Sequence, residues 1–240
     1  TAAEAPAVMD EATPTDLAPL REPPAAPQVA THNFRFSEDY DLYPSGAKTK
    51  YKNNVMAIKL LKQIELEKRT ATPEEQIILA RYVGWGGLAN AFSSTASGWE
   101  NEYQELKSLL TDVEYKAAMN STITAYYTEP DLIRHIYRAL ERFGFEGGPD
   151  RKILDPGMGT GNFYSVLPEQ FQGSKLFGVE LDSITGRIAK QLYPDADISI
   201  MGYEATKFED NSFDVILGNI PFNSVKIYDR RYNDLNPYIH

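Results

Sequence analysis

The sequence predicts an α/β fold, in which an incomplete parallel sheet of about four strands follows a mostly helical subdomain. Two observations predict it. From Tyr126 onward, short apolar segments alternate with single amphipathic segments, which is the order of βαβ units. Before residue 122, apolar residues recur at helical spacing instead. We therefore expect a linker over 1–32, a helical subdomain over 33–122, and the N-terminal part of a truncated sheet domain over 123–240.

The composition excludes several classes of protein. The 240 residues carry a formal net charge of −10, contain no cysteine and hold three scattered histidines. Cysteine zinc sites and thiol nucleophiles are therefore excluded, and we expect no metal. No apolar run is long enough for a membrane span, and the N-terminus lacks the basic and apolar regions of a secretory signal. We expect a cytoplasmic protein without a membrane partner.

The first two segments differ in composition. Residues 1–32 are rich in Ala and Pro and lack aromatic residues, so we expect disorder there, as in a linker within a longer protein. Apolar residues at helical spacing predict a helix over 53–68, and capping sequences that begin at Thr72 and Thr111 predict two more. Residues 33–36 suggest a short strand. Trp85 lies between glycines, and we expect it to fill the core rather than to meet a ligand.

The sheet domain is predicted element by element. A helix begins at Pro130, where proline suits the first helical turn. The elements that follow are a strand at 153–154, a glycine loop at 157–161, a helix over 162–171, a strand over 176–180, a helix over 182–192, and strands over 198–201 and 213–217. No catalytic group is predicted before this domain, so the candidate site lies where its strands end.

The first predicted strand runs into a loop that contains Gly157, Gly159 and Gly161. Glycines let a backbone approach a ligand closely where a helix N-terminus presents free N–H groups. The second strand ends at Glu180, where a carboxylate can bind the hydroxyls of a ribose. An acid favoured by a helix dipole is the structural alternative for Glu180. These features alone allow either NAD or S-adenosylmethionine as ligand.

The fourth predicted strand leads into Asn219-Ile220-Pro221-Phe222. The Asn219 amide oxygen and the Ile220 carbonyl can accept both N–H groups of an exocyclic amine and stabilise the charge that develops during methyl transfer. Pro221 stiffens the turn, and Phe222 offers a face on which an extruded base can stack. The pattern favours in-line transfer from S-adenosylmethionine. An oxidoreductase that uses NAD leaves these four residues unexplained.

At these residues the sequence resembles the amino-group DNA methyltransferases of the N6-adenine class. Their first motif, Asp-Pro-x-x-Gly-x-Gly-x-Phe, matches Asp155 to Phe163, and their catalytic Asn-Pro-Pro-Tyr/Phe motif matches 219–222 with Ile220 in place of the first proline. The resemblance implies a Rossmann-like, S-adenosylmethionine-dependent methyltransferase sheet. The cofactor-binding candidates are Tyr127, Thr128, Asp155, Gly157, Gly159, Gly161, Asn162, Phe163, Glu180, Leu181 and Glu204. Glu204 is equally compatible with a surface loop.

The order of the motifs refines the resemblance. The segment Tyr126–Pro130 is similar to the Tyr-Thr-Pro segment that contacts the methionine part of the cofactor, with Glu129 inserted. Its place before the glycine loop resembles the gamma order of type I restriction methylases. The stretch from Asn33 onward is similar to the methylase region of very large methylase–helicase polypeptides of phages and conjugative elements. This implies DNA as a partner, a restriction-modification setting and a downstream helicase module.

Several alternatives stay open. A glutamine side chain presents the same planar NH₂ group as adenine, so a protein glutamine methyltransferase is a second interpretation. A non-catalytic DNA-binding or interaction module is a third, motivated by Ile220, Glu129 and the missing strands. Methylation at cytosine C5 requires a thiolate and is excluded. Asn rather than Ser or Thr at position 219 disfavours N4 of cytosine as the target but leaves it open. The family's sheet has more strands than the four predicted, so we expect the remainder beyond His240, and we expect these residues alone to bind the cofactor weakly or not at all.

Overall fold

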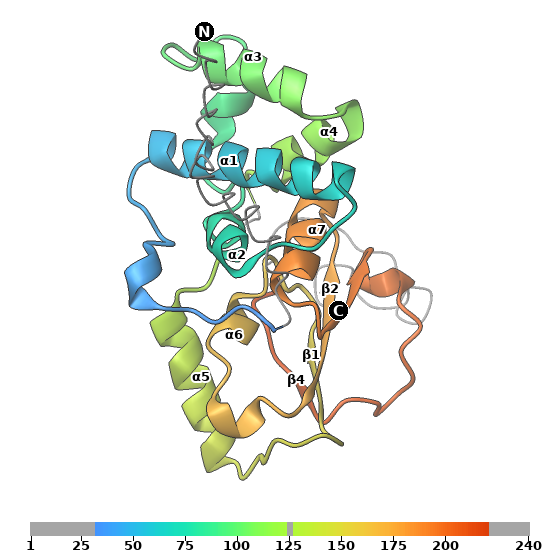
Figure 1. Ribbon diagram of the computed structural model, residues 1–240. Helices are drawn as coiled ribbons and strands as arrows, with labels where there is room; N and C mark the ends of the chain where they lie inside the picture. The colour runs from blue at the N-terminus through green and yellow to red at the C-terminus, as the bar shows by residue number, and fades with distance from the viewer. Residues whose placement is uncertain (1–31, 124–126, 221–240) are drawn as a thin grey trace, which may run out of the picture.

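The computed structural model describes residues 32–123 and 127–220 (Figure 1). A helical layer comes first in the chain and consists of α1 (Ala47–Leu66), α2 (Pro73–Ala80), α3 (Glu100–Leu109) and α4 (Asp112–Ser121). The sheet part holds α5 (Pro130–Arg142), β1 (Lys152–Asp155), α6 (Asn162–Ser165), β2 (Lys175–Glu180), α7 (Ser183–Leu192), β3 (Asp197–Ile200) and β4 (Val215–Ile216). Short 3₁₀ helices are η1 (Glu38–Tyr40), η2 (Ala89–Phe92), η3 (Glu169–Phe171) and η4 (Tyr203–Ala205). The predicted linker lies outside the described residues, apart from His32.

The helix starts follow the capping signals in the sequence. Thr72 caps α2 by accepting from the Glu75 N–H at 3.2 Å, and the Glu75 carboxylate accepts from the Thr72 N–H at 2.9 Å. Thr111 and Glu114 form the same reciprocal pair at the start of α4. Both predicted helix starts are therefore confirmed, and each cap satisfies backbone donors that a helix end leaves free. Helix α3 was not predicted.

The four strands form a parallel sheet in the order β3-β2-β1-β4. Ile153 of β1 pairs with Leu176 of β2 on one side and with Val215 of β4 on the other. Because all strands run in one direction, their carboxyl ends meet at one edge of the sheet. This confirms the predicted α/β class and Rossmann-like sheet, and it brings the segments after β1, β2 and β4 together.

The predicted helix over 162–171 is wrong in its length. Helix α6 ends at Ser165, and η3 begins after Pro168. Proline disfavours helical backbone angles in the residue that precedes it, so Pro168 prevents the helix from continuing through Leu167. The last predicted strand is also shorter, because only Val215 and Ile216 pair with β1.

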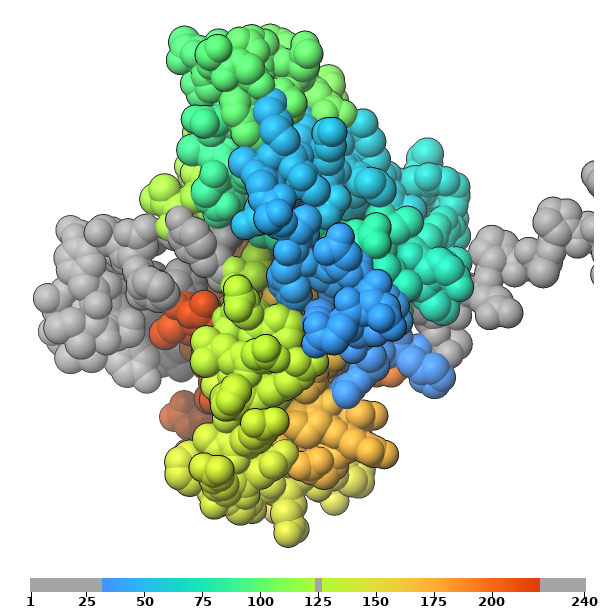
Figure 2. Space-filling view, turned by 90° about the vertical axis from the view of Figure 1, so that its left-hand side faces the viewer, coloured from blue at the N-terminus to red at the C-terminus, as the bar shows by residue number. Residues whose placement is uncertain are grey.

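Residues 33–36 lie extended but do not join the sheet. The Phe34 N–H donates to the Leu192 carbonyl at 2.7 Å, and the Phe36 N–H donates to the Ser165 carbonyl at 2.9 Å. This segment, here called the strap, thus supplies donors to the free carbonyls at the C-terminal ends of α7 and α6. Figure 2 shows the blue segment that begins with the strap lying between the helical layer and the yellow-green α5.

A cluster of ionic side chains joins the helical layer to the sheet part. Arg187 of α7 binds Glu65 of α1 (Nε–Oε1, 2.8 Å) and Glu114 of α4 (Nη1–Oε1, 2.9 Å). Lys62 of α1 contacts the second Glu114 oxygen at 3.0 Å. Burial raises the pKa of Glu114, but hydrogen bonds from Thr111, Arg187 and Lys62 outweigh it and lower the pKa to about 2. This junction cluster (Lys62, Glu65, Glu114 and Arg187) holds α4 against α7.

Trp85 fills the core, as predicted. It is 1% exposed, and its ring makes edge contacts with Tyr82 and Phe92. Residues of the helical layer and of the sheet part, such as Leu61 and Ile188, belong to one cluster of buried apolar residues. No helix within 32–123 or 127–220 has the length and apolar character that crossing a bilayer requires.

Candidate functional site

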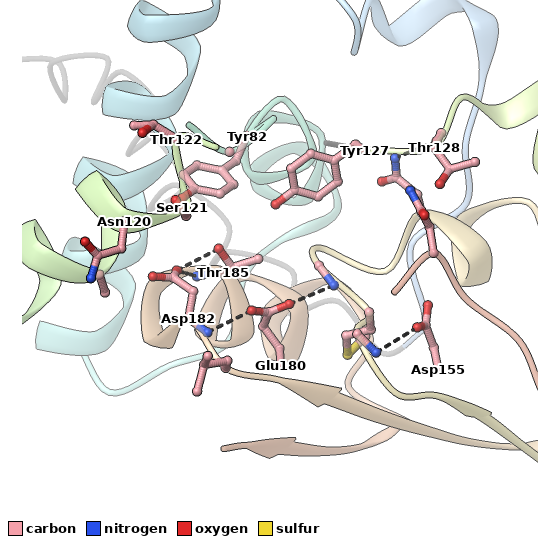
Figure 3. Close-up of a pocket in the computed structure, with 18 of the residues that line it drawn as sticks. Tyr82, Asn120, Ser121, Thr122, Tyr127, Thr128, Asp155, Glu180, Asp182 and Thr185 are labelled. Carbon is pink, nitrogen blue, oxygen red and sulfur yellow. Dashed lines mark hydrogen bonds between the residues drawn. The ribbon is translucent and has the colours of Figure 1, made fainter. Parts of the chain in front are cut away.

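A cavity of about 790 Å³ opens where the strands end, between the sheet and the helical layer (Figure 3). Predicted site residues that line it are Tyr127, Thr128, Asp155, Gly157, Gly159, Asn162, Phe163, Glu180, Leu181 and Asn219. Gly161, Glu204 and Ile220 do not line it. Pro221 and Phe222 lie outside the described residues. The topology rule that parallel strands share a carboxyl edge explains why segments so far apart in sequence meet here.

The loop after β1 is shaped by contacts that glycine permits. Gly159 has φ of 57°, and a Cβ there would lie 2.7 Å from the Tyr127 ring. Asn162 Nδ2 donates to the Thr128 carbonyl at 3.2 Å, which holds the same two segments together from the other end. Residues 127 and 128 are therefore packed on the glycine loop, which is a contact that the sequence did not predict.

Glu180 closes the loop from the side of β2. Its Oε2 accepts from the Gly159 N–H at 2.9 Å, and its Oε1 accepts from the Asp182 N–H at 2.7 Å. Burial raises the pKa of Glu180 to about 7, against the opposing effect of these backbone donors. Each carboxylate oxygen can accept more than one hydrogen bond, so both retain acceptor capacity toward the cavity.

Asp155 ends β1 and is 1% exposed. Its Oδ1 accepts from the Gly157 N–H at 3.1 Å, which fixes the turn into the glycine loop. Burial raises its pKa to about 7, and the nearby Glu180 charge adds to the shift. Together with Asp182, these acids make the cavity wall acidic, and no Lys, Arg or His of the described residues lines it. The electrostatics therefore favour a ligand that is neutral or cationic at this wall.

Three predicted residues have other positions. Gly161 has φ of 87°, its carbonyl accepts from the Tyr193 hydroxyl at 2.7 Å, and a Cβ would collide with the Tyr193 ring, so it serves packing behind the loop. Glu204 is exposed on η4, outside the cavity, which agrees with its alternative interpretation as a surface carboxylate. The Ile220 side chain is 61% exposed.

One wall of the cavity is formed by residues that were not predicted from the sequence. Tyr82, after α2, and Asn120, Ser121 and Thr122, at the end of α4, come from the helical layer. Asp182, which caps α7, and Thr185 of α7 complete that side (Figure 3). The capping role of Asp182 was readable from its place before a helix, but the α4 residues carry no sequence signal. Their place depends on the junction cluster, which joins residues far apart in the chain.

The fold and the site together indicate the class of protein to which this structure corresponds. A parallel sheet whose first strand ends in a glycine loop and whose second ends in an acidic residue is the nucleoside-binding half of a Rossmann-like fold. Residues 154–231 match the profile of a family described as "Methyltransferase domain". The fold is that of an S-adenosylmethionine-dependent methyltransferase, and its cofactor is S-adenosylmethionine.

The residues present fit this cofactor. The loop at Gly159 has no room for a side chain, Glu180 has spare acceptor capacity for ribose hydroxyls, and the acidic wall suits a molecule that carries a sulfonium charge. Among the described residues, no group of three or more His, Asp or Glu side chains is placed to hold a metal ion.

Similar proteins are known from phages and viruses. The chain is 27% identical over 171 residues to "Defense against restriction protein B" of Escherichia phage P1, which covers 70% of this chain and 6% of that protein. It is 32% identical over 78 residues to "Modification methylase CviBIII" of Paramecium bursaria Chlorella virus NC1A, covering 32% and 21%. A TehB-like SAM-dependent methyltransferase from Corynebacterium glutamicum is 25% identical, with a TM-score of 0.26 over 38% of this chain and 54% of that one. The chain thus spans a small part of both curated relatives.

Proposed function

We propose that this chain carries the catalytic centre of a DNA methyltransferase that methylates the exocyclic amino group of adenine, N6. One observation carries the proposal: Asn219 lines the same cavity as the glycine loop and Glu180. In the sheet order, β1 lies between β2 and β4. Asn219, which follows β4, therefore approaches the glycine loop from the side opposite to Glu180.

The chain's own groups then have separate roles. Glu180 and the glycine loop hold the cofactor, and bound S-adenosylmethionine supplies an electrophilic methyl group. The Asn219 amide oxygen accepts one N–H of the target amine, and the Ile220 carbonyl accepts the other. Any residue can supply that carbonyl, so isoleucine in place of proline is compatible with the role. Asn219 is exposed, which leaves the amide accessible to a base that enters from solvent.

Support for DNA as the acceptor comes from the relatives. One of them is named a modification methylase, and the other is named for defence against restriction. The catalytic roles of Pro221 and Phe222, a helicase module in the same polypeptide, and a cytoplasmic location in a mobile-element setting belong to the same proposal. A protein glutamine acceptor is the alternative that the site chemistry also permits.

The test is transfer of a tritiated methyl group to unmethylated DNA by the full-length polypeptide that contains these residues. Asn219→Ala should lower the rate by about 100-fold or more, because removing one polar group at a developing charge costs this much in other enzymes. Cofactor affinity should change by less than about threefold, since Asn219 is not expected to hold the cofactor. Asn101→Ala, which removes an exposed amide on α3, is the matched control.

Digestion of the labelled DNA should release N6-methyladenine. Label that enters a glutamine peptide but not DNA would contradict the DNA acceptor. Tight DNA binding without transfer to either acceptor would show a non-catalytic module instead. A rate that Asn219→Ala leaves unchanged would remove the basis of the proposal.

A further inference from the structure

Asn54 of α1 is a buried residue whose side-chain amide binds the backbone of a distant segment with both of its polar atoms. Its Nδ2 donates to the Gly84 carbonyl at 2.6 Å, and its Oδ1 accepts from the Val83 N–H at 2.9 Å. Asn54 is 0% exposed, so water cannot replace these two partners. Because buried backbone groups need hydrogen-bond partners, this amide fixes the position of residues 83 and 84 against α1.

The segment that Asn54 holds, residues 82–87, is here called the roof loop, and it belongs to the cavity wall. Tyr82 and Gly84 are among the residues that line the cavity. At the other end of the loop, the Gly87 N–H donates to the Thr122 carbonyl at 3.1 Å. The roof loop therefore connects the amide on α1 to the residues at the end of α4.

Tyr82 extends from the roof loop to the acidic wall of the cavity. Its ring lies near that of Tyr127, on the side of the cavity where Thr185 lies (Figure 3). Burial raises the pKa of the Tyr82 phenol, and the nearby charges of Asp182 and Glu180 raise it further. The phenol is therefore neutral and close to the carboxylate that ends β2, so a shift of the roof loop would change the packing beside that carboxylate.

The end of α4 is the part of this wall that a ligand can reach. Met119 is 42% exposed, Asn120 is exposed, and both line the cavity. The Thr122 hydroxyl donates to the Met119 carbonyl at 2.8 Å, and the Thr122 carbonyl accepts from the roof loop. The accessible residues of α4 are thus joined by hydrogen bonds to the loop that Asn54 holds.

Gln76 of α2 shows the same chemistry away from the cavity. It is 4% exposed, and its Nε2 donates to the Gln191 carbonyl at 2.9 Å and to the Leu192 carbonyl at 3.3 Å. This amide holds the end of α7 against the helical layer, and none of its partners lines the cavity. The two buried amides therefore differ in what they hold and not in the kind of contact they make.

We propose that Asn54 is a positioning residue for the S-adenosylmethionine site, which sets the affinity for the cofactor by holding the roof loop and, through it, the end of α4. Asn54 does not line the cavity, so it acts through these segments and not by contact with the cofactor. The inference goes beyond the proposed function, because it needs the cofactor but not the DNA acceptor. It makes the helical layer a determinant of cofactor binding.

The test compares Asn54→Ala with Gln76→Ala in the full-length polypeptide that contains these residues. Both substitutions leave buried backbone groups without an amide partner, so both should lower the urea midpoint of unfolding. Affinity for S-adenosylhomocysteine is measured by equilibrium dialysis under conditions in which both variants are folded. Asn54→Ala should weaken binding by about tenfold or more, since a site wall displaced by about 1 Å can cost up to 100-fold. Gln76→Ala should change it by less than about twofold, because distant sites act nearly independently.

A second variant protects the test against misfolding. Asn54→Asp keeps the acceptor for the Val83 N–H and replaces the donor to the Gly84 carbonyl with an oxygen. Burial raises the pKa of such a carboxyl, and its protonated form again donates to that carbonyl. The dissociation constant of the variant divided by that of the wild type should be about tenfold at about pH 8 and near one at about pH 5. Both proteins contain Glu180, so its own titration cancels in this ratio. Gln76→Glu should keep a ratio near one at both pH values.

The outcomes separate this inference from the proposed function. Equal losses of affinity in the Asn54 and Gln76 variants would overturn the inference, because binding would then follow stability alone. Unchanged affinity in the folded Asn54 variants, with methyl transfer lost in Asn219→Ala, would overturn the inference and leave the function standing. The expected loss and its recovery at low pH, without methylation of DNA by the wild type, would do the reverse. A wild type that does not bind S-adenosylhomocysteine at millimolar concentration would contradict both.

Discussion

The fold shifts the pKa values of the cavity acids and of the junction-cluster acid Glu114 in opposite directions. Glu114 has a side chain 9% exposed, but Lys62 and Arg187 contact it and its pKa falls to about 2. Asp155 and Glu180 accept hydrogen bonds from backbone N–H groups of the described residues, and their pKa values rise to about 7. Lys62 and Arg187 contact Glu114 where helices meet. No Lys, Arg or His of the described residues lines the cavity, so further donors to the cavity acids would come from a ligand.

Among the changes that test this contrast between acids, neutralising a cavity acid should have the largest effect. Glu180→Gln should weaken S-adenosylmethionine binding by about 30-fold or more, because each hydrogen bond to a charged acceptor contributes about 1.5–3 kcal/mol. An amide also places an NH₂ group against one of the two backbone donors that Glu180 now accepts. Isothermal titration measures the affinity, with Glu209→Gln, an exposed loop carboxyl, as control. Equal affinities in the two variants would refute a ribose-binding role.

Removing a cation from the junction cluster should have a smaller effect, and on stability. Arg187→Ala leaves Glu114 with one cation and Glu65 with none from this cluster, which should lower the free energy of unfolding by about 1–2 kcal/mol after allowance for solvent screening. Urea denaturation measures it. Arg151→Ala breaks an exposed pair with Asp214, which solvent screens, and should lower the free energy of unfolding by less than Arg187→Ala does. Similar losses in both variants would mean that the junction contributes no more than a surface pair.

The smallest expected effect is a difference in pH dependence. The folded pKa of Glu114 lies below its ordinary value of 4.5, so its contribution to stability is present above pH 4.5 and is lost as pH falls toward 2. The folded pKa values of Asp155 and Glu180 lie above their ordinary values of 3.8 and 4.5. Their contribution is present below about pH 4 and is lost as pH rises through 7.

Urea denaturation across pH 2–8 checks both signs. The difference in unfolding free energy between the wild type and Glu180→Gln should fall as pH rises through about 7, whereas the difference for Glu114→Gln should fall as pH drops below about 4.5. Two differences with the same slope would contradict the contrast. Cofactor binding should tighten as pH rises through about 7, since the ionised Glu180 is the better acceptor.

The sequence predicted the parts of this molecule that local signals specify. Strands β1 to β3 and helix α7 lie within one or two residues of their predicted bounds, because alternation and capping are read within a short window. The predicted helix over 162–171 is interrupted after Ser165 because Pro168 follows. This proline is visible in the sequence, but the prediction did not take it into account. Helix α3 was missed although Tyr103, Leu106 and Leu109 recur at helical spacing, because its N-cap residue Trp99 makes no side-chain capping hydrogen bond that would mark its start.

The residues of the candidate site were likewise predictable only where a local signal or a topology rule specifies them. Residues at strand ends were predictable because a topology rule places them, as for Glu180 and Asn219. The contribution of Tyr82 and Asn120 was not, because it depends on how α4 is held against α7 by Arg187 and Glu114. Tertiary contacts of this kind leave no periodic trace in a single sequence.

The strap has a consequence for cooperativity. Phe34 and Phe36 donate to carbonyls of Leu192 and Ser165, and Phe34 is buried in the same core as α1 and α7. A split near residue 122 would therefore divide one folding unit rather than separate two. Heating should unfold the helical layer and the sheet part together, in a single calorimetric peak. Proteolysis after Phe36 should destabilise the C-terminal end of α7 together with the helical layer.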